Sequence, residues 1–216
     1  MKTILFDFDG TIADSFDAVL QITNRLALEF GYEPASPSEI KRLKNLSSRE
    51  IIRQSNIPMF RLPLLLRRLK REMSQEINQL QPIVGIYAAL LQLQQQGHRL
   101  GIVTSNTADN VAAFLRNHQM ESLFDYIQPG VALFGKGRSI RRVARQHQLN
   151  PASIVYVGDE TRDIEAAKAI AIPVIAVGWG FNSIAALSAC NPDALVQQPG
   201  ELVAAIARLD QEWRAK

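Results

Sequence analysis

The sequence has a single cysteine, Cys190, among its 216 residues. One thiol cannot form an intramolecular disulfide, and a zinc cluster built from cysteines is excluded. The three histidines, His98, His118 and His147, are scattered without the spacing of a metal site. We therefore expect a protein of a reducing compartment.

Long apolar runs are also missing. Asp7 interrupts the apolar N-terminal run much earlier than a secretory signal allows. No stretch approaches the roughly 18 to 20 uncharged apolar residues that cross a bilayer, and the nearest one, residues 170–179, contains Pro173. We expect no signal peptide, no membrane partner and a cytoplasmic location.

A strong charge of either sign is absent as well. The chain has 24 Lys and Arg against 21 Asp and Glu, which gives a net charge of +3, and it is 47% hydrophobic. This composition is typical of a soluble globular protein and gives no general nucleic-acid footprint. The length fits one large domain, or a domain of about 150 residues that carries an insertion.

The fold class follows from short, β-branched apolar runs that alternate with helical patterns. The runs are residues 3–8, 100–104, 154–157 and 174–177, with a weaker one at 126–131 that Pro129 and Gly130 interrupt. The helical patterns are residues 108–118, 139–147, 163–171, 184–189 and 202–208. This alternation predicts a doubly wound parallel α/β sheet, which we assign to a core domain of residues 1–14 and 81–216.

Residues 15–80 break this rhythm and predict a helical insertion, which we interpret as a second, smaller domain. Helical periodicity covers residues 16–30, 48–54 and 62–80, without a convincing strand. Residues 36–80 hold ten basic and four acidic side chains, a local charge of +6. A solvated helical face would explain most of these charges, but the excess favours an anionic ligand. We expect some of the arginines, Arg49 and Arg53 among them, to face that ligand.

Two acidic groups follow predicted strands. Asp7 and Asp9 come at the end of the first strand, where alternation would point both carboxylates to one face and Gly10 would permit a turn. Asp159 and Asp163 follow the strand at residues 154–157. Strand ends meet in one crevice of an open α/β sheet, and such a carboxylate cluster suits Mg²⁺. The alternative interpretation is that these acids cap helices and turns.

Four motifs in the same order carry a resemblance to a known family. The run DFDGTIADS at residues 7–15 closely resembles the first motif of the haloacid dehalogenase (HAD) superfamily, whose phosphatases begin with DxDGT. Residues 102–106 (IVTSN) resemble the second motif, Lys136 the third, and residues 158–163 (GDETRD) the fourth. The helical insertion lies where the small C1-type cap of this family belongs. One departure is Gly137, because many relatives have proline after the motif lysine.

The resemblance implies a Mg²⁺-dependent phosphatase of the phosphoglycolate phosphatase branch. Asp7 would attack phosphorus to form an aspartyl-phosphate, while Asp9 would protonate the leaving oxygen and then activate water. Mg²⁺ would be held by the Asp7 carboxylate, the Asp9 main-chain carbonyl and Asp159, with Asp163 in or near the metal shell.

The resemblance also implies how a small phosphorylated metabolite binds. Thr104 would hydrogen-bond the phosphoryl oxygens as part of the catalytic set, and Ser105 and Asn106 would contribute to the same substrate site. Lys136 would neutralise charge on the nucleophile and the phosphate. We add Arg49 to the substrate-binding set because of the charge of the insertion. We expect the protein to be a monomer or a homodimer.

Several other functions compete with this hypothesis. Residues 130–137 nearly spell a P-loop but end on Gly137 where a hydroxyl is needed, and residues 178–183 lack the third glycine of a dinucleotide fingerprint. A phosphomutase of the β-phosphoglucomutase type shares the same core and cap class, and a non-catalytic phospho-ligand-binding module is a further alternative. Dehalogenase chemistry is disfavoured, because it does not call for the acid/base Asp9 or for a metal.

Overall fold

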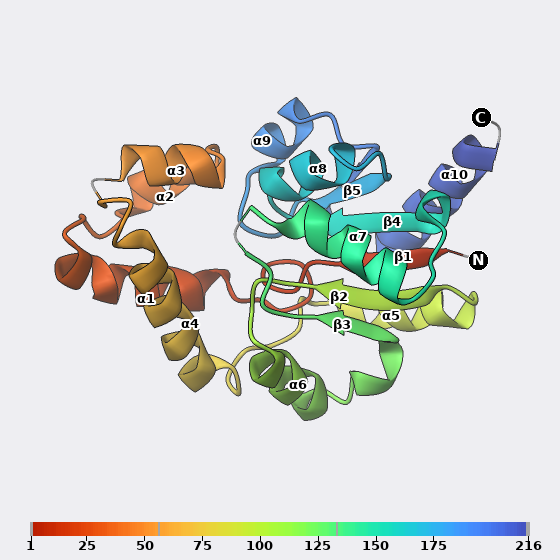
Figure 1. Cartoon of the computed structure of the whole chain (residues 1–216), viewed down its shortest axis with the longest axis horizontal. Helices are drawn as coiled ribbons and strands as arrows, with labels where there is room; N and C mark the ends of the chain where they lie inside the picture. The colour runs from red at the N-terminus through yellow and green to blue at the C-terminus, as the bar shows by residue number, and fades with distance from the viewer. Residues whose placement is uncertain (1, 56, 133, 215–216) are drawn as a thin grey trace.

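The computed structural model describes residues 2–55, 57–132 and 134–214 (Figure 1). Six parallel strands form one sheet in the order β3-β2-β1-β4-β5-β6. The strands are β1 (Thr3–Phe6), β2 (Arg99–Val103), β3 (Tyr126–Gln128), β4 (Ile154–Gly158), β5 (Val174–Val177) and β6 (Ala194–Val196). This sheet confirms the predicted doubly wound α/β class.

The register of the sheet brings the predicted motifs to one edge. Phe6, the last residue of β1, pairs with Ile102 of β2 and Val157 of β4. The residues that follow these positions therefore leave the sheet together at its carboxyl edge, next to the point where the strand order reverses.

Helices cover both faces of the sheet. One face is buried by α5 (Ile86–Gln95), α6 (Ala108–Asn117) and α10 (Leu202–Arg214), and the other by α7 (Lys136–Gln146), α8 (Thr161–Lys168) and α9 (Ile184–Ala189). Short 3₁₀ turns lie at Glu121–Leu123, Pro151–Ser153 and Pro199–Glu201. Successive residues of β1 point to opposite faces, so that Ile4 and Phe6 belong to the first core and Leu5 to the second.

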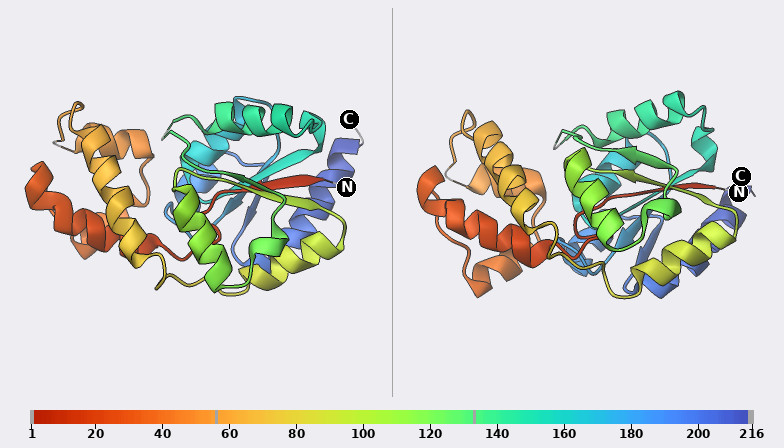
Figure 2. Two further views of the ribbon diagram at one scale, coloured as in Figure 1. Left: turned by 60° about the horizontal axis from the view of Figure 1, so that its bottom comes forward. Right: turned by 90° about the horizontal axis from the view of Figure 1, so that it is seen from below.

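The remaining helices gather beyond the carboxyl edge, toward which the strand arrows point (Figure 1). They are α1 (Phe16–Phe30), α2 (Pro37–Leu43), α3 (Ser48–Gln54) and α4 (Leu62–Glu76). Figure 2 shows the same grouping from two further directions. Buried side chains of α1 and α4, such as Leu26 and Leu65, pack together. We call residues 15–80 the helical insertion below.

Several boundaries differ from the sequence prediction. The first strand ends at Phe6 rather than at residue 8, the last insertion helix ends at Glu76, and α7 begins at Lys136 rather than at residue 139. The prediction did not include α2, α5 or β6. Leu133, within the P-loop-like run, lies outside the described residues. No helix in the described part of the chain is both long and apolar enough to cross a membrane.

Candidate active site

Asp7 stands at the point where β1 leaves the sheet. Its backbone N–H still donates to the carbonyl of Val157, at 2.8 Å, and its Oδ1 accepts from the N–H of Phe8, also at 2.8 Å. The chain turns immediately afterwards. Asp9 is therefore placed by a loop, and the expected strand alternation between Asp7 and Asp9 is wrong because the strand is two residues shorter.

The loop after Asp7 is folded tightly over the site. The N–H groups of Ile12 and Ala13 both donate to the carbonyl of Phe8, at 2.9 and 3.0 Å. Gly10 has φ of 74°, in the left-handed region, and a Cβ there would overlap the side chains of Asp159 and Phe181. Glycine is thus required for two reasons: it adopts the left-handed turn readily, and it leaves room for the carboxylate of Asp159, a candidate metal ligand.

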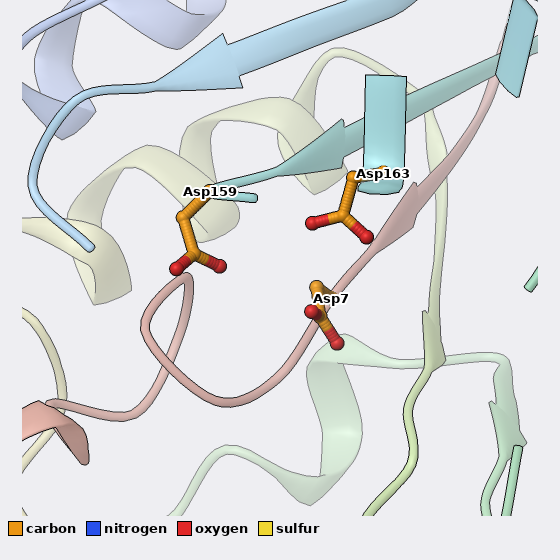
Figure 3. Close-up of side chains that lie close together, drawn as sticks. All are labelled: Asp7, Asp159 and Asp163. Carbon is orange, nitrogen blue, oxygen red and sulfur yellow. The ribbon is translucent and has the colours of Figure 1, made fainter. Parts of the chain in front are cut away.

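Three buried carboxylates meet at this edge (Figure 3). Asp7 comes from the end of β1, Asp159 from the end of β4 and Asp163 from the first turn of α8, and one oxygen of each lies within 4.8 Å of the others. Burial, and then the charges of its acidic neighbours, raise the pKa of Asp159 well above its usual range. Burial also raises the pKa of Asp163, to about 6, although Lys136 opposes the shift.

Lys136 is the buried cation of this cluster. Its Nζ lies 2.6 Å from Oδ2 of Asp7 and also contacts Oδ1 of Asp163. Burial disfavours the charged lysine, but the charges of Asp163 and Asp7 outweigh it and raise the pKa of Lys136. Lys136 is the first residue of α7, which begins three residues before the helical pattern that the sequence predicts.

The cluster fits a divalent cation of the hard type. Three carboxylates are buried together, and burial followed by the charges of acidic neighbours raises the pKa of Asp159; a bound cation would offset both costs. All the available ligand atoms are oxygens, which Mg²⁺ prefers. Asp159 is preset for this role, because Thr11 Oγ1 donates to its Oδ1 at 2.7 Å and Phe181 N–H donates to its Oδ2 at 2.8 Å.

Asp9 lies outside the group of three and has a different environment. Its carboxylate accepts from Nδ2 of Asn106, at 3.1 and 3.3 Å to the two oxygens. Burial, and then the charge of Asp7, raise the pKa of Asp9 to about 6. A carboxyl group with a pKa near the operating pH suits proton transfer in both directions.

The second motif lies beside Asp9 and is joined to it through Asn106. Thr104 is fully buried, and its Oγ1 accepts from the N–H of Asn106 at 3.0 Å. Ser105 is half-buried between them. The structure thus brings the candidates of this motif next to Asp9.

Arg49, unlike the buried carboxylates, lies on the surface of the helical insertion. It is exposed on α3, and its guanidinium lies 5.0 Å from the ring centre of Phe134. It lines a recess of about 230 Å³ together with Phe134, Lys136 and arginines of α7 and α8. Arg53 is also exposed, and no contact places it at this recess.

The sequence interpretation missed the residues that join the insertion to the site. Glu160 is half-buried at the start of α8 and accepts from Ser48 Oγ of the insertion at 2.8 Å. Trp179 Nε1 donates to the carbonyl of Thr11 at 3.2 Å. Asn182 Nδ2 donates to the carbonyls of Lys44 and Leu46, at 3.0 and 2.9 Å. The signal for this loop was the pair of glycines at 178 and 180, whose Cβ atoms would have no room.

The fold and the site together define an α/β enzyme with a buried carboxylate and lysine centre. The sequence matches the haloacid dehalogenase-like hydrolase family over residues 4–177. It is 37% identical over 209 residues to a phosphoglycolate phosphatase of Synechococcus elongatus, covering 97% of this chain and 99% of that protein. A phosphoglycolate phosphatase of Vibrio parahaemolyticus is 25% identical, with 96% of each chain covered.

Solved structures show the same fold. A predicted phosphatase from Clostridium acetobutylicum superposes with a TM-score of 0.82 at 21% identity, covering 96% of this chain and 98% of that one. The chain therefore belongs to the haloacid dehalogenase-like hydrolases, as the four motifs indicated.

Proposed function

We propose that this protein is a Mg²⁺-dependent phosphatase that hydrolyses a small phosphomonoester, of the phosphoglycolate kind, through an aspartyl-phosphate. The observation that carries this proposal is the contact of Lys136 with Asp7 inside a buried carboxylate cluster. The full-length relatives named above are phosphoglycolate phosphatases, which supports the same substrate class.

The metal would be held by Asp7 and Asp159, with the main-chain carbonyl of Asp9 and with Asp163 nearby. A bound Mg²⁺ supplies positive charge that offsets the negative charge of the phosphoryl group and of the nucleophile. The protein's own residues prepare the remainder of the site.

In the first half of the reaction, the Asp7 carboxylate attacks phosphorus. The bond from phosphorus to the ester oxygen breaks, and that oxygen takes a proton from Asp9, so that an alcohol leaves. Lys136 and Thr104 stabilise the charge that builds up on the phosphoryl oxygens. The raised pKa of Asp9 keeps a protonated fraction available near neutral pH.

In the second half, water attacks the phosphorus of the aspartyl-phosphate. Asp9 takes the proton from this water, the bond to the Asp7 oxygen breaks, and inorganic phosphate leaves. The helical insertion stands beside the carboxyl edge, and we propose that it acts as a cap that limits water and selects the substrate.

The test is release of inorganic phosphate from a panel that contains phosphoglycolate, glucose 1-phosphate and p-nitrophenyl phosphate. We expect Mg²⁺-dependent release from phosphoglycolate, loss of activity with EDTA and recovery on adding Mg²⁺. Conversion of glucose 1-phosphate into glucose 6-phosphate without phosphate release would instead show a mutase.

Metal binding has a readout that needs no activity. At 100 times its dissociation constant, Mg²⁺ should stabilise the fold by about 2.7 kcal/mol, which raises Tm. Asp159→Asn should abolish this Mg²⁺-dependent rise, while Asp109→Asn, on the exposed start of α6, should keep it. An equal rise in both variants would show that the cation binds elsewhere.

A further inference from the structure

Asn110 is a polar residue on the buried face of α6. The other buried residues of this helix are Val111, Phe114 and Leu115, whereas Asn110 is only 3% exposed. Burying an amide at a position that an apolar side chain would fill costs free energy unless its hydrogen bonds are made. We therefore look to the hydrogen bonds of Asn110, rather than to core packing, for the reason that an amide occupies this position.

The contact of Asn110 is Oδ1 of Asn106. Asn110 Nδ2 donates to this oxygen at 2.8 Å, and the N–H of Thr107 donates to it at the same distance. The two lone pairs of the Asn106 carbonyl oxygen are thus both used. Nδ2 of Asn106 consequently faces the other way, toward the carboxylate of Asp9.

The reverse orientation of the Asn106 amide is disfavoured at both ends. A flipped amide would oppose its NH₂ group to two donors, the N–H of Thr107 and Nδ2 of Asn110. It would also turn its oxygen toward the carboxylate of Asp9. Either mismatch leaves buried polar groups without partners, which costs more than the hydrogen bonds gain.

We infer that Asn110 is a positioning residue for the reaction: it locks the Asn106 amide so that its NH₂ group holds Asp9 where the leaving oxygen is protonated. This inference rests on the proposed function, because it assigns the orientation of the acid/base group of that reaction. Asn110 acts through Asn106 and touches neither Asp9 nor the substrate.

The inference predicts a dependence on the leaving group. The group that leaves from phosphoglycolate is the alkoxide of glycolate, a poor leaving group that needs a proton, whereas p-nitrophenolate leaves from the aryl ester without one. The first irreversible step governs kcat/KM for both esters. Misplacing Asp9 should therefore lower kcat/KM for phosphoglycolate and hardly change it for p-nitrophenyl phosphate.

The experiment uses Asn110→Leu, which removes the donor and keeps the number and branching of the side-chain heavy atoms. We expect kcat/KM for phosphoglycolate to fall by about tenfold, a part of the 10²-fold or more that a general acid contributes, with KM nearly unchanged. For p-nitrophenyl phosphate the change should stay below about twofold. Asn110→Ala gives a second variant without the donor if the leucine variant does not fold.

Val111→Ala is the matched control, because it loosens the same buried face of α6 without touching the amide relay. It should lower Tm but leave the ratio of kcat/KM for the two esters unchanged. In a double-mutant cycle, Asn110→Leu should have no further effect once Asn106→Ala has removed the residue through which it acts.

Equal losses on both esters, or additive losses in the cycle, would give Asn110 a structural role only and overturn the inference. A wild-type enzyme that hydrolyses p-nitrophenyl phosphate and phosphoglycolate, with an Asn110→Leu variant that keeps the same ratio, would overturn the inference alone. A wild-type protein that hydrolyses neither ester would overturn the proposed function and this inference with it.

Discussion

At the scale of single residues, Asp7 combines two demands. As the proposed nucleophile it must carry a negative charge, yet it is 3% exposed and lies close to two other carboxylates. The contact with Lys136 and the N–H of Phe8 offset part of this cost. The same contacts leave little freedom for the carboxylate, which is preorganised before any substrate arrives.

We expect Asp7→Asn to abolish turnover while the protein still folds. The amide is nearly isosteric but is not a competent nucleophile, so the rate of phosphate release should fall by at least about 10³-fold. Lys136 keeps its contact with Asp163 in this variant. The measurement is steady-state phosphate release with circular dichroism of the same sample. A folded variant with wild-type rates would rule out covalent catalysis at Asp7.

A second prediction concerns Gly158, the last residue of β4. A Cβ at this position would overlap the carboxylate of Asp163. We expect Gly158→Ala to displace that carboxylate and to raise the Mg²⁺ concentration for half-maximal activity by roughly tenfold or more, as losses of supporting contacts around metals do. Gly200→Ala is the matched control, because no atom lies within 4 Å of its added Cβ. An unchanged Mg²⁺ requirement in Gly158→Ala would separate Asp163 from metal binding.

Residue types and order could be predicted at this scale, but orientations could not. The positions of Asp7 and Asp159 follow from acids at, or just beyond, the ends of predicted strands. The hydrogen bond from Thr11 to Asp159 joins residues far apart in the sequence, and the one from Asn110 to Asn106 reaches from α6 to a residue that precedes the helix. Such contacts depend on side-chain rotamers, which the sequence pattern does not specify.

At the scale of elements, length, composition and capping residues decide which helices and strands could be predicted from the sequence. The strands of the sheet centre are continuous β-branched runs, so their existence was evident. β6 has only three residues, which is too few for a clear period. The helix α7 begins three residues earlier than expected, because Gly135 precedes it without a side-chain cap that would mark the start.

The loop from Gly178 to Ser183 is the element that connects the insertion to the core. Asn182 donates to two carbonyls of the insertion, and its Oδ1 accepts from the N–H of Thr161 at 2.9 Å, at the start of α8. The Nζ of Lys44 donates to the carbonyl of Gly180 at 3.2 Å. This small set of polar contacts fixes the insertion next to Asp159.

We expect Asn182→Ala to loosen the insertion without unfolding the core. The loss of three hydrogen bonds of a buried amide should cost about 1–3 kcal/mol and speed hydrogen exchange in residues 44–47. Asn78→Ala is the control, because its amide contact with Asn117 is exposed. Unchanged exchange in residues 44–47 of Asn182→Ala would show that other contacts hold the insertion.

At the scale of the whole molecule, charge is distributed unevenly. The chain carries a net +3, while residues 36–80 alone carry +6. The sequence indicated that this excess belongs to the insertion, but not which arginine reaches the site, because prolines 58 and 63 break the helical phase. In the structure, Arg49 lines the recess that also includes Lys136, while Arg67 lies on the exposed side of α4.

This placement predicts a substrate-dependent effect of Arg49. A carboxylated ester such as phosphoglycolate brings a second anionic group, which the guanidinium can attract from the insertion side, whereas p-nitrophenyl phosphate has no such group. We expect Arg49→Gln to lower kcat/KM for phosphoglycolate by roughly five- to tenfold, about 1 kcal/mol for one partly solvated charge contact, mainly through KM. The aryl ester should change less than twofold, and Arg67→Gln should change neither ester. Equal losses on both esters would place Arg49 in the general architecture of the recess, and no loss on either would mean that the positive charge of the insertion is only a solvated surface.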